Sequence, residues 1–180
     1  PSGLSSYMGI EPRLADSTLV GGYEADIERY YSRYAENREY LTNIYLGTAD
    51  GGFVNLINNT LSNYDPRKRP WYELATRSPD EIVVTAPYIG TTLVTMIAVA
   101  KTVTRPDGSL IGVQSVAVTL GWLTSLIDEG TIWDSSYLML VNNDGTIIAD
   151  PANRDNVFKN IADIAGPPYE GLTDAILRDG

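Results

Sequence analysis

The strongest constraint on the fold is a pair of β-branched runs on either side of Arg105-Pro106-Asp107-Gly108. Proline presets the φ angle that a turn needs, and Asp-Gly accepts turn conformations that other residues avoid. The flanking runs, 93–104 and 109–120, are rich in Val, Ile and Thr, which pack well on a pleated surface. The sequence therefore predicts a long hairpin of two central strands.

Further elements are predicted on both sides of this hairpin. Tyrosines at helical spacing after Gly21-Gly22 predict an amphipathic helix over about residues 23–37. The remaining expected elements are strands over 40–46 and 53–57, a polar loop over 58–65, a helix from Pro70, a strand over 82–88 and a helix over 120–129. This order predicts an α+β fold, compatible with a PAS-like antiparallel sheet of about five strands flanked by helices.

A second, similar unit is expected from Ser135 onward. Strands over 137–142 and 146–149 flank Asn143-Asp144-Gly145, and residues 160–165 and 169–178 are predicted to be helical. A two-stranded sheet is marginal alone, so this unit is either cut short or packed against the first. The expected organisation is an N-terminal helical segment (1–37), a PAS-like module (38–130) and a partial second module (131–180).

The composition excludes several kinds of chemistry. The chain has no cysteine and no histidine, which rules out thiol chemistry, a Ser-His-Asp triad and zinc sites made of Cys and His. Its net charge of −10 disfavours nucleic-acid binding. No cofactor or metal is expected. No apolar run approaches the roughly 20 residues of a membrane span, and Pro1 to Gly3 do not begin a signal peptide, so the chain is expected to be part of a longer protein.

Recognition chemistry is concentrated between Tyr64 and Tyr72. This stretch contains Arg67, Arg69 and Trp71 besides the two tyrosines. Arginine matches a carboxylate with two parallel hydrogen bonds, while Trp and Tyr add apolar walls and hydrogen-bonding groups. Such a set suits a pocket for a small anionic or zwitterionic molecule. The alternative, that Arg67 pairs with a nearby acid and Trp71 belongs to the core, stays open on these residues alone.

The string Tyr64-Asp65-Pro66-Arg67-Lys68-Arg69-Pro70-Trp71-Tyr72-Glu73-Leu74-Ala75 resembles the motif of double Cache (dCache) domains. These are PAS-like extracytoplasmic sensors of prokaryotic chemoreceptors and sensor histidine kinases. Further stretches match in the expected order: 44–52, 84–88, 107–113 and 137–151. The resemblance implies a membrane-distal ligand-binding module and a partial membrane-proximal one. It also implies a periplasmic or extracellular location and a membrane-anchored parent protein, and it leaves a homodimer in the full receptor open.

The resemblance also implies the ligand-binding residues. In amino-acid-binding members of the family, a Tyr, an Arg, a Trp and two further Tyr line the pocket, and the Arg and Trp hold the ligand carboxylate. Carried onto this sequence, these are Tyr64, Arg69, Trp71, Tyr72 and Tyr88. Arg67 is expected to be structural and to brace the loop.

The sequence departs from the family where ammonium-binding acids are expected. Ala117 stands in place of the usual Asp, and Gly90 stands where a second acid sometimes occurs. Burying an ammonium group without a carboxylate partner is unfavourable, so a standard α-amino acid is in doubt. A small carboxylate with an uncharged body fits better, and Thr91, Thr92, Thr95, Gln114 and Ser115 could offer it neutral hydrogen bonds.

The predicted function is therefore an extracytoplasmic sensor domain that binds a small carboxylate or amino-acid-like ligand and relays a signal to a receptor or kinase. Asp50, Asp107 and Asp144 each precede Gly and are explained by turns, and no paired carboxylates are evident, so an enzyme is not expected. Two alternatives remain: a structural or interaction module without a ligand and, with less support, a carboxylate-based hydrolase or lyase.

Overall fold

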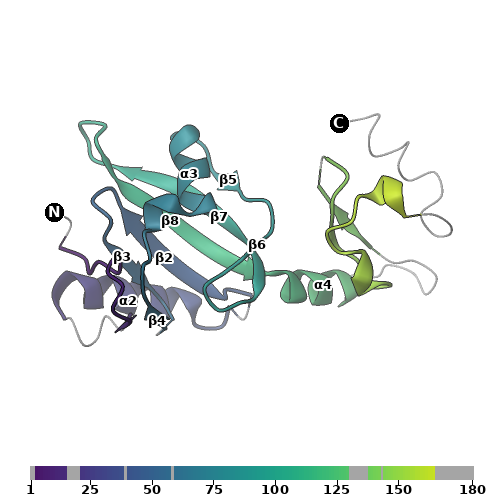
Figure 1. The fold of residues 1–180 in the computed structure, drawn as a ribbon, viewed down its shortest axis with the longest axis horizontal. Coiled ribbons are helices and arrows are strands. Elements are labelled where there is room, and N and C mark those ends of the chain that lie inside the picture. Colours follow the sequence, from purple (N-terminus) through teal and green to yellow (C-terminus); the bar gives the residue numbers. More distant parts are fainter. Residues whose placement is uncertain are drawn as a thin grey trace. The chain divides into compact units, whose positions relative to one another are not determined.

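The computed structural model describes residues 3–15, 21–38, 40–57, 59–129, 138–142 and 144–164 of the chain, without the side chains of 128 and 129. The chain divides into two compact units, Pro1–Thr119 and Leu120–Gly180. Figure 1 shows the larger sheet and its helices in the first unit. The mixed α+β class with an antiparallel sheet is confirmed.

Six strands of the described residues form this sheet, in the order β3-β2-β8-β7-β5, with β6 also paired to β7. All the pairings are antiparallel. Its strands are β2 (Asn43–Thr48), β3 (Phe53–Asn55), β5 (Val83–Val84), β6 (Tyr88–Ile89), β7 (Thr95–Thr104) and β8 (Leu110–Thr119). The two longest, β7 and β8, are joined by the predicted turn, in which Gly108 takes a φ of 83°.

The two faces of the sheet pack against different helices. On one face, Trp71, Tyr72 and Ala75 of α3 (Pro70–Arg77) pack in a cluster that also contains small residues of β7 and β8. On the other face, Tyr31 of α2 (Gly22–Ala35) packs with Ile44 and partly buried neighbours. Because side chains alternate along a strand, Tyr45 faces α3 while Ile44 faces α2. Figure 1 shows these two helices on opposite sides of the sheet.

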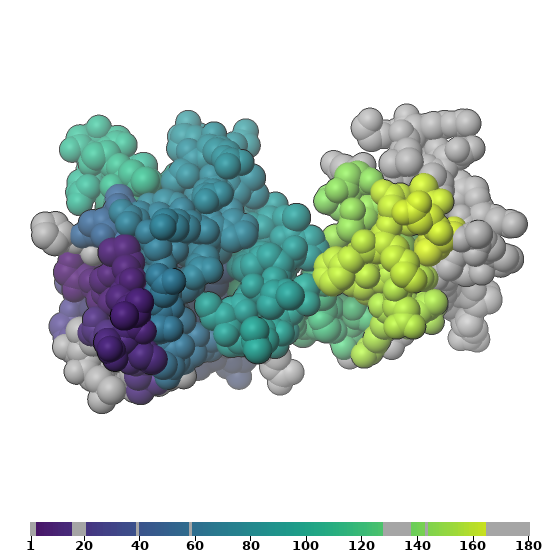
Figure 2. All heavy atoms as spheres, viewed as in Figure 1, coloured from purple at the N-terminus to yellow at the C-terminus, as the bar shows by residue number. Residues whose placement is uncertain are grey.

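An extended N-terminal segment joins the first unit through backbone contacts. Tyr7 forms a β-bridge with Tyr64, and β1 (Arg13–Leu14) pairs with β4 (Thr60–Leu61). The Phe53 N–H donates to the Ser5 carbonyl at 2.8 Å. Figure 2 shows this segment, in purple, along the surface of the first unit. Among the described residues of the expected N-terminal helical segment, the helix is therefore α2, and residues 3–15 contain no helix.

Two other elements differ from their predictions. The strand expected over 82–88 is two short strands, β5 and β6, separated by a stretch that includes Pro87. Proline has no N–H to donate to a ladder, which explains the break. The loop expected over 58–65 contains a strand, β4, which pairs with β1. The sequence did not predict this strand, because its partner lies far away in the chain and no local pattern reveals the pairing.

The second unit contains a small hairpin and helical turns. Its elements are α4 (Leu120–Glu129), β9 (Leu140–Val141), β10 (Ile147–Ala149) and the 3-10 turns η2 (Arg154–Asn156) and η3 (Ile161–Asp163). β9 pairs with β10 as predicted, and Ile147, Ala149 and Ile161 are fully buried. The helix predicted over 160–165 is the single turn η3, and the helix predicted over 169–178 lies outside the described residues. That this unit is a membrane-proximal module stays a prediction.

Candidate functional site

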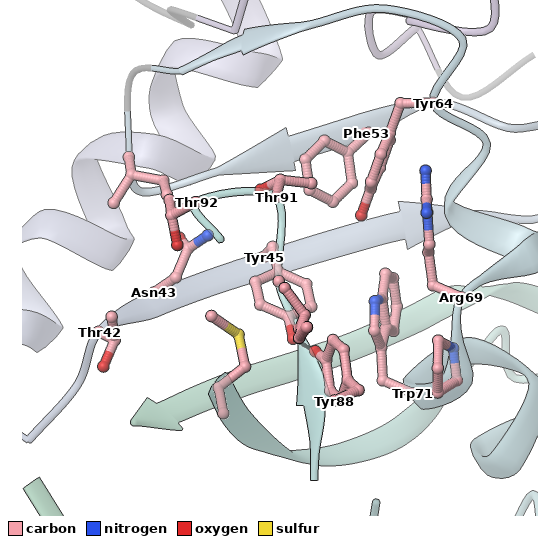
Figure 3. A pocket seen from close by; sticks show the side chains of 15 residues that line it. Thr42, Asn43, Tyr45, Phe53, Tyr64, Arg69, Trp71, Tyr88, Thr91 and Thr92 are labelled. Atoms are coloured by element: carbon pink, nitrogen blue, oxygen red, sulfur yellow. Dashed lines mark hydrogen bonds between the residues drawn. The ribbon is translucent and has the colours of Figure 1, made fainter. Parts of the chain in front are cut away.

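A cavity of about 170 Å³ lies on the α3 side of the sheet in the first unit. Figure 3 shows the side chains around it. The lining residues come from β2, β3 and residues beside them, the segment before α3, the start of α3, β6, the β6–β7 loop and the start of β7. They are Thr42, Asn43, Tyr45, Phe53, Ile57, Tyr64, Arg69, Pro70, Trp71, Tyr88, Ile89, Gly90, Thr91, Thr92 and Met96. Of the five predicted site residues, Tyr64, Arg69, Trp71 and Tyr88 line it and Tyr72 does not.

Local sequence explains how Arg69 reaches the cavity. Asp65 caps η1 (Pro66–Lys68) by accepting the Arg67 N–H at 3.0 Å, and Pro66 begins this turn. Pro70 begins α3, where its missing N–H costs nothing. Arg69 lies between these two proline-started elements with extended backbone angles, φ −100° and ψ 146°. Its side chain therefore projects from a rigid junction.

The two arginines of the motif have different surroundings. Arg67 forms an ion pair with Asp65 at 2.9 Å, in agreement with its predicted bracing role. The Arg69 guanidinium instead stacks 4.3 Å from the centre of the Tyr64 ring. Its Nε is buried with no hydrogen-bond partner among the described residues, and no described carboxylate forms an ion pair with it. Arg69 as a whole is half-buried, but a buried donor such as its Nε needs an acceptor, so this side chain has capacity for an incoming anion.

Trp71 forms the floor beside Arg69. Only 2% of its surface is exposed, and its ring meets Tyr45 edge-on at 4.9 Å. Gly47 on β2 makes this packing feasible, because a Cβ there would lie 2.8 Å from Trp71 Cη2. Figure 3 shows the indole nitrogen on the cavity side of the ring. Trp71 thus belongs both to the core and to the cavity wall, and its contact with a ligand stays a prediction.

Tyr72 packs away from the cavity. It is buried, and its ring meets Trp71 at 5.6 Å. Burial raises the pKa of its hydroxyl, and the positive charge of Arg67 opposes this rise. The Tyr72 hydroxyl is therefore close enough to Arg67 for the arginine charge to act on it. Its predicted contact with ligand stays a prediction, while its packing against Trp71 is a feature of the structure.

Two hydroxyls meet in the middle of the cavity wall. Tyr45 of β2 and Tyr88 of β6 lie 3.0 Å apart, oxygen to oxygen. Burial raises the pKa of both, and at Tyr45 the neighbouring Tyr88 raises it further. Burial also raises the pKa of Tyr64, although the Arg69 charge works in the opposite direction. All three rings therefore stay neutral at physiological pH and do not repel an anion.

We call the region of Tyr64, Arg69 and Trp71 the Arg69 end of the cavity, and the region of Asn43, Gly90, Thr91, Thr92 and Met96 the Asn43 end. At the Asn43 end, a Cβ added to Gly90 would lie 2.4 Å from Met96 Cε, so a thioether fills the space next to that glycine. The Asn59 side chain donates to Thr91 Oγ1 at 3.1 Å and ties the β6–β7 loop to the β3–β4 loop. Figure 3 shows Asn43, Thr91 and Thr92 at this end.

Ala117 lies on the same face of the sheet but does not line the cavity. It is fully buried and pairs in register with Asn43 on β2 and Ala98 on β7. Directly opposed residues of antiparallel strands share a face. Two small residues, Ala98 and Ala117, therefore lie side by side next to Asn43, and at Ala117 the family resemblance leads us to expect an acid.

The sequence interpretation missed Asn43, Tyr45 and Met96. Asn43 and Tyr45 belong to a strand, and their period-two spacing places both on one face with Gly47. That spacing could have identified them once the face was known, but nothing local indicates which face holds the cavity. Of the five residues suggested as neutral hydrogen-bonding groups, Thr91 and Thr92 line the cavity. Gln114 instead accepts a hydrogen bond from Tyr31 on the α2 side.

Other site chemistries find little support in the described part of the chain. Among those residues, no group of three or more Asp, Glu, His or Cys side chains is arranged to hold a metal. None of the described helices is long and apolar enough to span a bilayer. The lining residues include one charged side chain, Arg69, so the cavity offers a single fixed positive charge.

Comparison with known proteins identifies the family. Residues 18–125 match the model of the first PDC sensor domain of methyl-accepting chemotaxis protein-like receptors. The chain is 37% identical over 122 residues to the methyl-accepting chemotaxis protein McpA of Pseudomonas putida, covering 67% of this chain and 19% of McpA. It is 30% identical over 168 residues to McpC of Bacillus subtilis, covering 88% of this chain and 25% of McpC. The chain therefore belongs to this family of chemoreceptor sensor domains.

Solved structures agree on the fold. The ligand-binding domain of the Pseudomonas aeruginosa amino acid chemoreceptor PctC, in complex with GABA, is 29% identical with a TM-score of 0.63, covering 77% of this chain and 61% of that one. The domain of Pseudomonas fluorescens CtaA, in complex with L-valine, is 27% identical with a TM-score of 0.60, covering 81% and 72%. The resemblance to Cache domains is thereby confirmed. The chain spans about a fifth to a quarter of the curated relatives' length.

Proposed function

We propose that this domain is an extracytoplasmic sensor that binds a small carboxylate-bearing ligand in the cavity. The observation that carries the proposal is the Arg69 guanidinium, which lines the cavity with a buried Nε that lacks a partner among the described residues. A planar fork of donors beside a cavity is suited to a carboxylate, which accepts two parallel hydrogen bonds. GABA and L-valine, the ligands of the two structural relatives, both carry such a group.

Signal relay follows from linkage between ligand and conformation. A ligand shifts a receptor only if it binds two states with different affinity. The cavity joins residues of β2, α3 and the β6–β7 loop, so a ligand that contacts all three favours the arrangement in which they are close together. We propose that the rest of a membrane-anchored receptor, which could be a homodimer, reads this change. The domain itself is proposed to have no catalytic role.

The proposal is tested by calorimetric titration of the domain with short carboxylates and amino acids, comparing wild type with Arg69→Ala. Loss of charge-assisted hydrogen bonds is expected to weaken binding by about 2 kcal/mol, equivalent to roughly 30-fold. The matched control is Arg67→Ala, which removes the same side chain two residues away. Arg67 does not line the cavity, so binding is expected to stay within about twofold of wild type.

Three outcomes contradict the proposal. An Arg69→Ala domain that binds as tightly as wild type would place the carboxylate elsewhere. A wild-type domain that binds no small carboxylate and no amino acid would favour a structural or interaction module. Turnover of a bound compound would show an enzyme.

A further inference from the structure

We propose that the cavity prefers elongated carboxylates that carry an uncharged oxygen acceptor at the far end of the chain, the 5-hydroxy and 5-oxo acids. This inference rests on the proposed function, because Arg69 holds the carboxylate while Asn43, at the opposite end of the cavity, meets the second polar group. Shorter acids, and amines of the same length, are expected to bind less tightly.

The separation of the two ends follows from the strand that joins them. Gly47 of β2 pairs with Phe53 of β3, and the centre of the Phe53 ring lies 4.8 Å from that of Tyr64. The Arg69 guanidinium lies 4.3 Å from the centre of the Tyr64 ring, so it belongs to the Gly47 end of β2. Asn43 lies four residues earlier on the same strand. At a rise of about 3.4 Å per residue, Asn43 and Gly47 are about 13 Å apart.

This separation sets the length of a ligand that reaches both ends. A hydrogen bond of about 3 Å at each end leaves about 7 Å between the two ligand oxygens. An extended chain advances about 1.2 Å per bond, so about six bonds span this distance. That is the number of bonds between a carboxylate oxygen and an oxygen on the fifth carbon of the chain. In a 2-hydroxy acid the two oxygens are too close together to meet both ends.

The middle of the cavity suits an unsubstituted chain. The hydroxyls of Tyr45 and Tyr88 lie 3.0 Å apart and pair with each other, so they do not require a polar group from the ligand. Phe53, Ile57 and Met96 add apolar surface to the lining. The volume of about 170 Å³ slightly exceeds the roughly 150 Å³ that accommodates benzene in another protein. Methylene groups therefore match this part of the cavity in chemistry and in size.

Asn43 offers a hydrogen-bond donor at the far end. Its Oδ1 accepts the Leu56 N–H at 3.2 Å, which fixes the amide orientation, and its Nδ2 donates to no other described residue. Figure 3 shows Asn43 and Arg69 at opposite ends of the cavity with Tyr45 between them. A hydroxyl or carbonyl oxygen accepts from Nδ2, whereas an ammonium group only donates. The described lining residues include no carboxylate, so an ammonium at this end lacks a counter-charge as well.

The test measures affinities by calorimetry on the whole domain. Pentanoate, 5-hydroxypentanoate and 5-aminopentanoate share one chain length and differ only in the group on the fifth carbon. The hydroxy acid is expected to bind about fivefold more tightly than pentanoate, which corresponds to one neutral hydrogen bond. It is expected to bind about tenfold more tightly than the amine, whose ammonium the site leaves unpaired.

The outcomes separate this inference from the proposed function. If 5-hydroxypentanoate binds no more tightly than pentanoate, or less tightly than 5-aminopentanoate, the inference is overturned. The proposed function still stands in that case, provided that Arg69→Ala abolishes the binding that remains. If no carboxylate and no amino acid binds, both are overturned.

Chain length is tested separately with propanoate and 3-hydroxypropanoate. With its carboxylate at Arg69, 3-hydroxypropanoate extends only about 5 Å from oxygen to oxygen, which is too short to reach Asn43. Its hydroxyl is therefore expected to change affinity by less than about twofold. A gain as large as that of the five-carbon pair would contradict the assigned separation.

Substitutions at Asn43 test its role directly. Asn43→Ala is expected to bring 5-hydroxypentanoate to within about twofold of pentanoate. This variant leaves no orphaned backbone group, because the Leu56 N–H also donates to the Ile44 carbonyl at 2.8 Å. Asn43→Asp keeps the acceptor for Leu56 but replaces the donor with a negative charge. It is expected to make 5-aminopentanoate the tighter ligand by about tenfold.

The matched control is Asn37→Asp, which adds the same charge at an exposed position after α2 and is expected to leave the preference unchanged. Circular dichroism confirms that each variant is folded. A folded Asn43→Asp domain that still prefers the hydroxy acid contradicts the assigned role. Should that variant fail to fold, an Asn43→Ala domain that still separates 5-hydroxypentanoate from pentanoate as wild type does contradicts it equally.

Discussion

The two ends of the cavity are built in different ways. The Arg69 end rests on two proline-started elements and a cluster of packed rings, in which Tyr64 and Trp71 are almost fully buried. The Asn43 end is formed by the start of β2, the start of β7 and a loop whose Thr91 and Thr92 are exposed. A rigid end suits the group that all candidate ligands share, the carboxylate. The end with small and flexible side chains suits the part that differs between ligands.

The largest expected effect tests whether the Arg69 end is a packed core. Trp71→Ala is expected to lower the free energy of unfolding of the first unit by about 3 to 5 kcal/mol, because it leaves a large void under Arg69. Chemical denaturation followed by circular dichroism measures this change. Trp71→Phe, which keeps most of the volume, serves as control and should lose much less. A loss below about 1 kcal/mol for Trp71→Ala would mean that the indole is dispensable for packing.

A second substitution tests the contact between the motif and the sheet. In Gly47→Ala the added Cβ would lie 2.6 Å from Pro66 Cβ and 2.8 Å from Trp71 Cη2, so these groups must move. We expect a destabilisation of about 1 to 3 kcal/mol in thermal or chemical unfolding. Gly9→Ala is the matched control, because no heavy atom lies within 4 Å of its added Cβ. If both variants unfold alike, the Arg69 end is less rigid than described.

The hydroxyl pair between the two ends provides a smaller effect. Tyr88→Phe removes one partner of the 3.0 Å contact with Tyr45 and is expected to reduce stability by about 1 kcal/mol. Tyr30→Phe on α2, whose side chain is 67% exposed, should change nothing measurable. Measuring ligand affinity in the same variants shows whether the pair also contacts ligand; unchanged affinity would limit it to a structural role.

The smallest effect concerns pH. The hydrogen bond from Arg67 holds the pKa of Asp65 below its ordinary value of 3.8. The folded state therefore binds the proton less readily than the unfolded chain, so this interaction stabilises above pH 3.8 and is lost as the pH falls through the lower folded value. Asp65→Asn should cost at most about 1 kcal/mol at pH 7 and make less difference near pH 3. A difference that grows on acidification would contradict this assignment.

Local sequence was sufficient for elements whose determinants are contiguous. Arg105-Pro106-Asp107-Gly108 predicted the β7–β8 hairpin, and Pro70 predicted the start of α3, because turn and cap preferences act over a few residues. The departures at Gly90 and Ala117 were also visible in the sequence. By contrast, the β1–β4 pairing joins residues far apart in the chain, and no local pattern indicates it.

The sequence by itself determined the family and the motif from Tyr64 to Tyr72, since both depend on residues next to one another in the chain. Only the tertiary structure decided which members of the motif line the cavity. Trp71 and Tyr72 are adjacent, yet α3 directs the first toward the cavity and packs the second beside it. The tertiary structure also brought Asn43 and Met96 to the opposite end, because register across β2, β8 and β7 sets which side chains share a face.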